Sequence, residues 1–98
     1  MQIEGHEVKR LEQLLLLIDE IQDDIFAYRI PKVSSTMIQL AEGLTEWIKT
    51  LSSNEQTVVN PVLKAMIDSY AKKDFLLVAD LLQFELKPLL NVQRSEQL

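Results

Sequence analysis

The sequence predicts a single all-α domain of 98 residues, an antiparallel up-down four-helix bundle, and three observations support this prediction. First, apolar residues recur at steps of three and four in four separate segments, which is the spacing of a buried helix face. Second, the chain has only two glycines and three prolines, too few to supply the turns of a many-stranded sheet. Third, a hydrophobic share of 47% and a charged share of 26% are typical of a soluble globular protein.

The first expected helix spans residues 5–28 and ends before Pro31, because the residue that precedes a proline is biased out of the helical region. Its buried seam is a heptad-like series of large side chains: Leu11, Leu14, Ile18, Ile21, Ile25 and Tyr28. Leu16 and Leu17 complete a turn that is apolar on all sides. Such a turn indicates either the centre of a bundle or an exposed interface.

The second expected helix spans residues 36–51, because Thr36 and Gln39 fit a capping box. Ser34 or Ser35 are alternative caps. The expected seam is Met37, Ala41, Leu44, Ile48 and Leu51, with Leu40 and Trp47 beside it. Gly43 costs about 1 kcal/mol inside a helix relative to alanine, so we expect it to allow the close approach of a neighbouring helix.

Two starts are compatible with the third helix. Asn60 followed by Pro61 fits an N-cap with proline at the first helical position, which would leave a loop up to Val59. The apolar spacing also continues back through Val58 and Val59, and on this ground we prefer a helix over residues 55–72 that is kinked at Pro61.

The fourth expected helix spans residues 74–91, with Asp74 as its N-cap. It carries more leucines than one buried face requires, which indicates that it is surrounded on more than one side. Pro88 removes a donor and crowds the carbonyl of Phe84, so we expect a bend or a tightened last turn. The polar residues 91–98 are expected to fray.

A weak internal similarity suggests two related helical hairpins. Shifting the sequence by 38 residues places Leu40-Ala41-Glu42-Gly43-Leu44 on Val78-Ala79-Asp80-Leu81-Leu82. The same shift places Tyr28 on Met66. Chance matches are common between sequences of helical periodicity, so unrelated hairpins remain the alternative.

The charge of the chain argues against nucleic-acid binding. The net charge is −5, and all of it falls in residues 1–28, which hold seven acids and two bases, whereas residues 29–98 hold eight of each. Nucleic-acid binding requires a basic footprint, which is the opposite of this pattern. An acidic helix could attract a basic partner, although most such faces are simply solvated.

The residue inventory also argues against an enzyme, a metal site or a cofactor. The chain has no cysteine, and its one histidine, His6, cannot supply the paired Glu-x-x-His motifs of a di-iron bundle. The acids Asp19, Glu20, Asp23 and Asp24 lack the spacing of a calcium loop. Glu85 is expected at the margin of the buried face, where a carboxylate must be paired or hydrogen-bonded.

The N-terminal residues lack the basic and apolar regions of a signal peptide. The longest apolar run, Leu14 to Ile18, is far shorter than a membrane span. We therefore expect a soluble cytoplasmic protein with no membrane partner.

The last helix also resembles a known type of sequence. Val78-Ala79-Asp80-Leu81-Leu82, followed by Glu85-Leu86 and Pro88-Leu89-Leu90 after the Lys73-Asp74 corner, is similar to the closing helix of a family of short uncharacterised bacterial all-α proteins. The second helix, with Ala41-Glu42-Gly43 before Trp47-Ile48, is similar as well. The resemblance implies an antiparallel bundle and a loose kinship with small flagellar and secretion chaperones; it implies no activity.

These observations favour a non-enzymatic protein-interaction module that receives an amphipathic helix of a protein partner. The candidate contact residues are the surplus apolar side chains: Leu16, Leu17, Trp47, Leu76 and Leu77. Two alternatives stay open, namely a constitutive homodimer with no further partner and a small-ligand site in the bundle core near Glu85.

Overall fold

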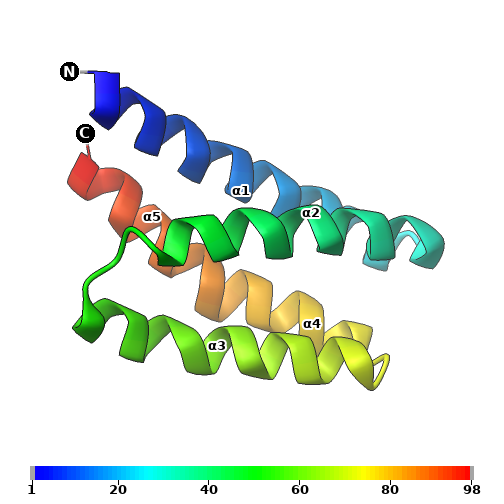
Figure 1. Ribbon diagram of the computed structural model, residues 1–98. Coiled ribbons are helices and arrows are strands. Elements are labelled where there is room, and N and C mark those ends of the chain that lie inside the picture. Colours follow the sequence, from blue (N-terminus) through cyan, green and yellow to red (C-terminus); the bar gives the residue numbers. More distant parts are fainter. Residues whose placement is uncertain (1, 98) are drawn as a thin grey trace.

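The structure is a computed structural model that describes the backbone of residues 2–97 and the side chains of residues 7–96. Its elements are α1 (Gln2–Phe26), α2 (Ile30–Ile48), α3 (Ser53–Ala71), α4 (Phe75–Leu81), the π-helical turn η1 (Leu82–Leu86) and α5 (Lys87–Gln97). Since α4, η1 and α5 follow one another without a break, residues 2–97 form four rods, and the all-α prediction is confirmed. Figure 1 shows the rods lying alongside one another, with both termini at the same end.

Two tight turns of the same geometry join α1 to α2 and α3 to α4. In the first, the N–H of Tyr28 donates to the carbonyl of Ile25 and that of Arg29 to Asp24, at 3.1 and 2.7 Å. In the second, Lys73 donates to Tyr70 and Asp74 to Ser69, both at 2.9 Å. Tyr28 and Lys73 both have φ of 60°, the left-handed conformation usually taken by glycine at the end of a helix.

Tyr28 is therefore not part of the buried seam of α1. It lies beyond the helix with its side chain 87% exposed. The corresponding turns are 45 residues apart, whereas the expected shift of 38 residues pairs Tyr28 with Met66, a buried residue inside α3. The register of 38 was thus wrong.

α2 begins at Ile30, six residues earlier than expected. Pro31 lies in its first turn, where a missing N–H costs no hydrogen bond. Thr36 is consequently inside the helix and buried, and its hydroxyl lies 3.2 Å from the carbonyl of Lys32 and 3.1 Å from Glu20 Oε2. The capping box expected at Thr36 was wrong because proline can begin a helix as well as end one.

α3 begins at Ser53 and continues through Pro61, so the continuous helix is confirmed and the loop alternative was wrong. Its cap is a capping box formed by Ser52 and Glu55, in which each side chain accepts from the backbone N–H of the other. Both free N–H groups are thereby satisfied.

The predicted start of the last rod is confirmed, whereas the prediction for its end was wrong. Asp74 caps α4 by accepting from the N–H of Leu77 at 3.2 Å. Residues 91–97, which were expected to fray, are helical. Before Pro88, where a bend or a tightened last turn was expected, the backbone instead widens into η1, in which the N–H of Lys87 donates to the carbonyl of Leu82.

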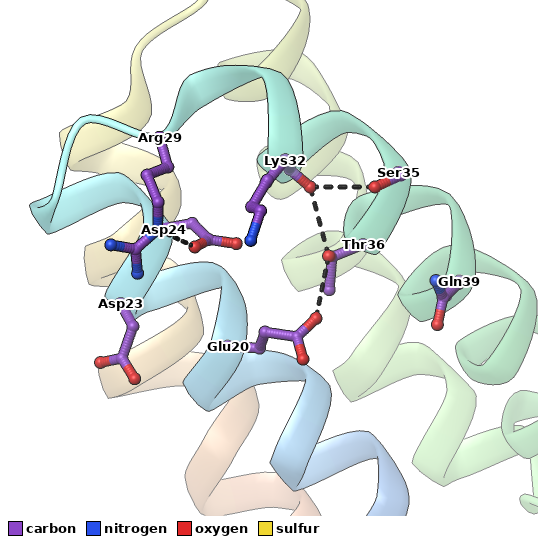
Figure 2. Close-up of a pocket in the computed structure, with 8 residues that line it drawn as sticks. All are labelled: Glu20, Asp23, Asp24, Arg29, Lys32, Ser35, Thr36 and Gln39. Carbon is purple, nitrogen blue, oxygen red and sulfur yellow. Dashed lines mark hydrogen bonds and ion pairs between the residues drawn. The ribbon is translucent and has the colours of Figure 1, made fainter.

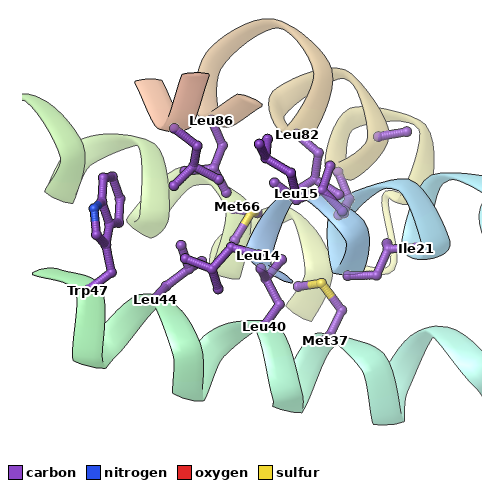
Figure 3. Close-up of a cluster of buried hydrophobic side chains, with 14 of the residues drawn as sticks. Leu14, Leu15, Ile21, Met37, Leu40, Leu44, Trp47, Met66, Leu82 and Leu86 are labelled. Atoms are coloured by element: carbon purple, nitrogen blue, oxygen red, sulfur yellow. The ribbon is translucent and has the colours of Figure 1, made fainter. Parts of the chain in front are cut away.

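Among the residues whose side chains are described, nineteen buried apolar residues form one core between the rods, with contributions from all four. Figure 3 shows Trp47, Leu44 and Leu40 of α2 directed at Leu14 of α1, Met66 of α3 and Leu82 and Leu86 of the last rod. Trp47 is 1% exposed, so it belongs to the core and not to a contact surface. The seam of α2 accordingly passes through Leu40 and Trp47, whereas Ala41 is exposed.

Gly43 serves the role expected of it. A Cβ placed on Gly43 would lie 2.6 Å from Leu14 Cδ2, well inside van der Waals contact. The missing side chain therefore lets the core residue Leu14 pack against the backbone of α2.

Candidate functional site

The candidate site is the outer side of the junction between α1 and the last rod. The side chain of Gln22 on α1 reaches Gln83 Oε1 at 3.0 Å and the carbonyl of Ala79 at 3.5 Å. Farther toward the termini, Lys87 Nζ lies 2.7 Å from Asp19 Oδ1. These contacts fix which residues of α1 and of the last rod lie side by side.

Beyond the Asp19–Lys87 pair, the junction opens into a hollow of about 450 Å³ between α1 and α5. Its lining is Glu12, Leu15, Leu16, Asp19, Lys87, Asn91 and Arg94. Leu16 is the most exposed apolar member of this lining and marks one end of the site.

Phe26 and Leu76 mark the other end. Phe26 lies one turn beyond Gln22 on α1, and Leu76 lies three residues before Ala79 on α4, so both flank the same junction. Phe84 follows Leu76 at two steps of four residues along the last rod. Leu77, the residue after Leu76, is 43% exposed but is rotated by about 100° around the helix from Leu76, so it lies outside this strip.

Four of these side chains are unusually exposed for their size. Leu16, Phe26, Leu76 and Phe84 each expose between 65% and 69% of their surface. We call these four residues the α1–α4 face. Singly scattered apolar residues need no explanation on a protein surface, whereas four on two neighbouring rods are a candidate interaction site.

The residues singled out from the sequence fall into three groups. Leu16 and Leu76 are exposed and belong to the α1–α4 face, Leu77 is exposed outside it, and Leu17 is partly buried against the core. Trp47, as described above, is buried within the chain, so the prediction that it is a contact residue was wrong. The expectation that Glu85 is a buried or marginal carboxylate was wrong. Glu85 is exposed, because η1 accommodates an additional residue and Leu86 takes the inward position.

Sequence reasoning missed Phe26 and Phe84. Phe26 is one residue from Ile25, a seam position, and Phe84 is two residues from Leu82. A helix rotates by about 100° per residue, so the spacing alone already placed both outside the seam. An aromatic residue outside the seam of a predicted helix was the available signal.

A second hollow, of about 410 Å³, lies at the turn between α1 and α2 (Figure 2). Its polar groups are largely engaged with one another: Arg29 Nε pairs with the buried Asp24 at 2.8 Å, and Thr36 pairs with Glu20. No buried side-chain nitrogen or oxygen among the described residues lacks a hydrogen-bond partner. The hollow is therefore explained by the structure of the turn.

No group of three or more histidine, cysteine or acidic residues in the described part of the chain is placed to hold a metal ion. The side chain of His6 lies outside the described residues. Within residues 2–97, none of the helices combines the length and the apolar character that crossing a membrane requires.

A polar clasp joins α3 to α5. Gln93 Nε2 donates to Glu55 Oε2 at 2.8 Å, and the N–H of Ser52 donates to Oε1 of the same carboxylate at 2.9 Å. These donors hold the pKa of Glu55 below its ordinary value, the backbone N–H of Ser52 contributing most. On α2 the pKa of Glu46 is also lowered, by a hydrogen bond from Lys49 and by the charge of that lysine.

Comparison with known proteins adds no assignment. No protein-family model, no curated protein and no solved structure matches the chain. The resemblance to short bacterial helical proteins therefore stays a prediction from the sequence.

Proposed function

We propose that the protein is a non-enzymatic interaction module whose α1–α4 face binds an amphipathic helix of a protein partner. The single observation that carries this proposal is the exposure of Leu16 and Phe26 on α1 and of Leu76 and Phe84 on the last rod, which lies beside α1. A shallow apolar strip between two helices accepts the apolar side of a third in the helix-in-groove mode of recognition. A chaperone-like role in the cytoplasm is consistent with this mode.

In this proposal the four rods form an antiparallel up-down bundle of two helical hairpins. The two matching turns and the lateral contacts of α1 with α2 and of α3 with α4 support that arrangement. The bundle supplies rigidity, and the outer sides of α1 and α4 supply the contacts.

The proposal is tested by titrating the ¹⁵N-labelled protein with helical amphipathic peptides and following its backbone amide shifts. We expect the shifted amides to lie in residues 12–26 and 76–91. Leu76→Ser/Phe84→Ser should weaken binding by at least about tenfold, since each buried apolar side chain contributes about 1.5–3 kcal/mol. The matched control is Ile38→Ser/Ile67→Ser, which removes two side chains of similar exposure, 61% and 58%, from α2 and α3. Equal loss in both variants, or no binding by any peptide, would contradict the proposal.

The second candidate is a constitutive homodimer through the same face. The presence of exposed apolar residues on two neighbouring rods favours it, because an isologous contact requires a patch that can face its own copy. Sedimentation equilibrium separates the two candidates: a dimer that Leu76→Ser/Phe84→Ser dissociates, with no peptide binding, would support it. The alternative of a small-ligand site near Glu85 lacks support, since that side chain is exposed.

A further inference from the structure

We infer that the helix bound by the α1–α4 face is basic, with lysine or arginine residues flanking its apolar side. This inference rests on the proposed function and adds the chemistry of the partner. It is carried by the charged residues that lie among the exposed apolar side chains.

The segments that carry the exposed apolar residues contain acids and no bases, and the only bases that line the hollow at the Leu16 end, among the described residues, are Lys87 and Arg94. Residues 11–28 and 75–86 hold seven acids and no lysine or arginine: Glu12, Asp19, Glu20, Asp23, Asp24, Asp80 and Glu85. Two of these are neutralised within the chain, Asp19 by Lys87 and Asp24 by Arg29. Glu20 also accepts from Thr36 toward α2.

The acids alternate with the apolar residues along each helix. On α4 and η1, Asp80 lies midway between Leu76 and Phe84, four residues from each, so all three share one stripe. On α1, Asp23 lies seven residues after Leu16 and three before Phe26, which also places it on the stripe of its neighbours. Asp23 and Asp80 are both exposed.

This alternation selects a partner by charge. A helix that buries its apolar side against Leu76 and Phe84 brings its flanking residues to Asp80 and Asp23, where a lysine or arginine gains and a glutamate is repelled. A second copy of this face would bring acids against acids, so the same pattern disfavours the homodimer. The distance from Leu16 to Phe26 along α1, about 15 Å at the helical rise, corresponds to roughly three turns of a bound helix.

The test uses three labelled 18-residue helical peptides with identical leucine positions and lysine, glutamine or glutamate on the flanks. Fluorescence anisotropy gives the Kd of each at about 50 mM and about 500 mM salt, since exposed charge pairs are screened at the higher concentration. We expect the leucine–lysine peptide to bind about five- to tenfold more tightly than the leucine–glutamine peptide at low salt, as two or three exposed ion pairs allow. The leucine–glutamate peptide should bind weakest, and the differences should shrink at high salt.

Matched charge variants separate recognition from general attraction to an acidic protein. Asp23→Asn/Asp80→Asn should abolish most of the preference for lysine, whereas Glu42→Gln/Asp68→Asn, which removes the same charge from α2 and α3, should retain it. Equal binding of the lysine and glutamine peptides, or equal effects of the two variant pairs, overturns the basic partner and leaves the interaction function standing. Absence of binding by all three peptides overturns both.

Discussion

The backbone N–H of Lys87 donates to the carbonyl oxygen of Leu82, five residues earlier. This π-type bond precedes Pro88, which has no N–H of its own to donate. The wide turn also affects the core, because the buried residues Leu82, Leu86 and Leu90 are spaced by four. In a regular α-helix, residues spaced by four differ in direction by about 40° around the helix axis. The wider π turn reduces this difference, so the three leucines stay directed at the core.

Deletion of Glu85 tests this explanation. Without it, Leu82, Leu86 and Leu90 would be spaced by three and four, which suits a regular α-helix, but Pro88 would then lie in a regular helix interior. We expect the deletion alone to lower the free energy of unfolding by about 3 kcal/mol, the cost of an interior proline. The same deletion combined with Pro88→Ala should recover most of that loss. Urea unfolding followed by circular dichroism measures both.

The control for this experiment is Glu85→Ala, which retains the chain length and removes only an exposed side chain. It should change stability by no more than about 0.5 kcal/mol. If the double variant is no more stable than the deletion alone, Pro88 is not the reason for the π turn.

Much of the fold followed from the sequence, because the core of a helical domain is encoded in local spacing. The seam of α1 from Leu11 to Ile25 is buried as expected, and Asp74 caps α4. The effects of proline were harder to predict. Pro31 lies in the first turn of α2, Pro61 lies inside the continuous helix α3, and Pro88 follows the π turn. A proline removes one donor in every case, but how the backbone adapts depends on the register that the surrounding core requires.

The candidate site followed only in part. Surplus leucines indicated that some apolar surface lies outside the core, and Leu16 and Leu76 are indeed exposed. Trp47 was misassigned although spacing could have placed it in the core. Met37, Leu40, Leu44, Trp47 and Leu51 alternate steps of three and four, and all five are buried. Spacing could not reveal that Leu16, Phe26 and Leu76 flank one junction, since that depends on which helices are neighbours.

Replacing Tyr28 by glycine should stabilise the protein. A non-glycine residue in the left-handed region costs about 1–2 kcal/mol, and Tyr28, at φ of 60°, is mostly exposed and gives up little packing. Allowing for the greater unfolded-state entropy of glycine, we expect a net gain of about 0.5–1 kcal/mol, measured by urea unfolding. Lys73→Gly should behave alike at the second turn.

Tyr28→Ala is the control for the effect of the side chain. It retains a Cβ and therefore the backbone cost, so it should gain little. A similar gain from alanine and glycine would show that the tyrosine side chain, and not the backbone conformation, limits stability.

Replacing Gly43 by alanine should destabilise the protein although alanine is the better helix former. The gain in helix propensity is about 1 kcal/mol, and the added Cβ would lie 2.6 Å from Leu14 Cδ2. Overpacking of this kind costs about 1–3 kcal/mol, so we expect a net loss of up to about 2 kcal/mol. In a Leu14→Val background, which lacks the clashing atom, the same change should become neutral or stabilising. A double-mutant cycle from urea unfolding measures this reversal, and its absence would refute the contact as the reason for the glycine.

The clasp around Glu55 should make stability depend on pH in a defined direction. The pKa of Glu55 is lower in the folded protein than its ordinary value of about 4.3, because Ser52 and Gln93 donate to its carboxylate. The unfolded chain therefore binds its proton first as pH falls, so the stabilisation is present above that ordinary value and is lost as pH falls through the lower folded value. Glu55→Gln should cost stability near pH 7 and progressively less toward pH 3, measured by urea unfolding at each pH.

Gln93→Ala, which removes one donor and retains the charge, should weaken this dependence without abolishing it. Parallel stability curves for the wild-type protein and Glu55→Gln over that range would contradict the role of the clasp.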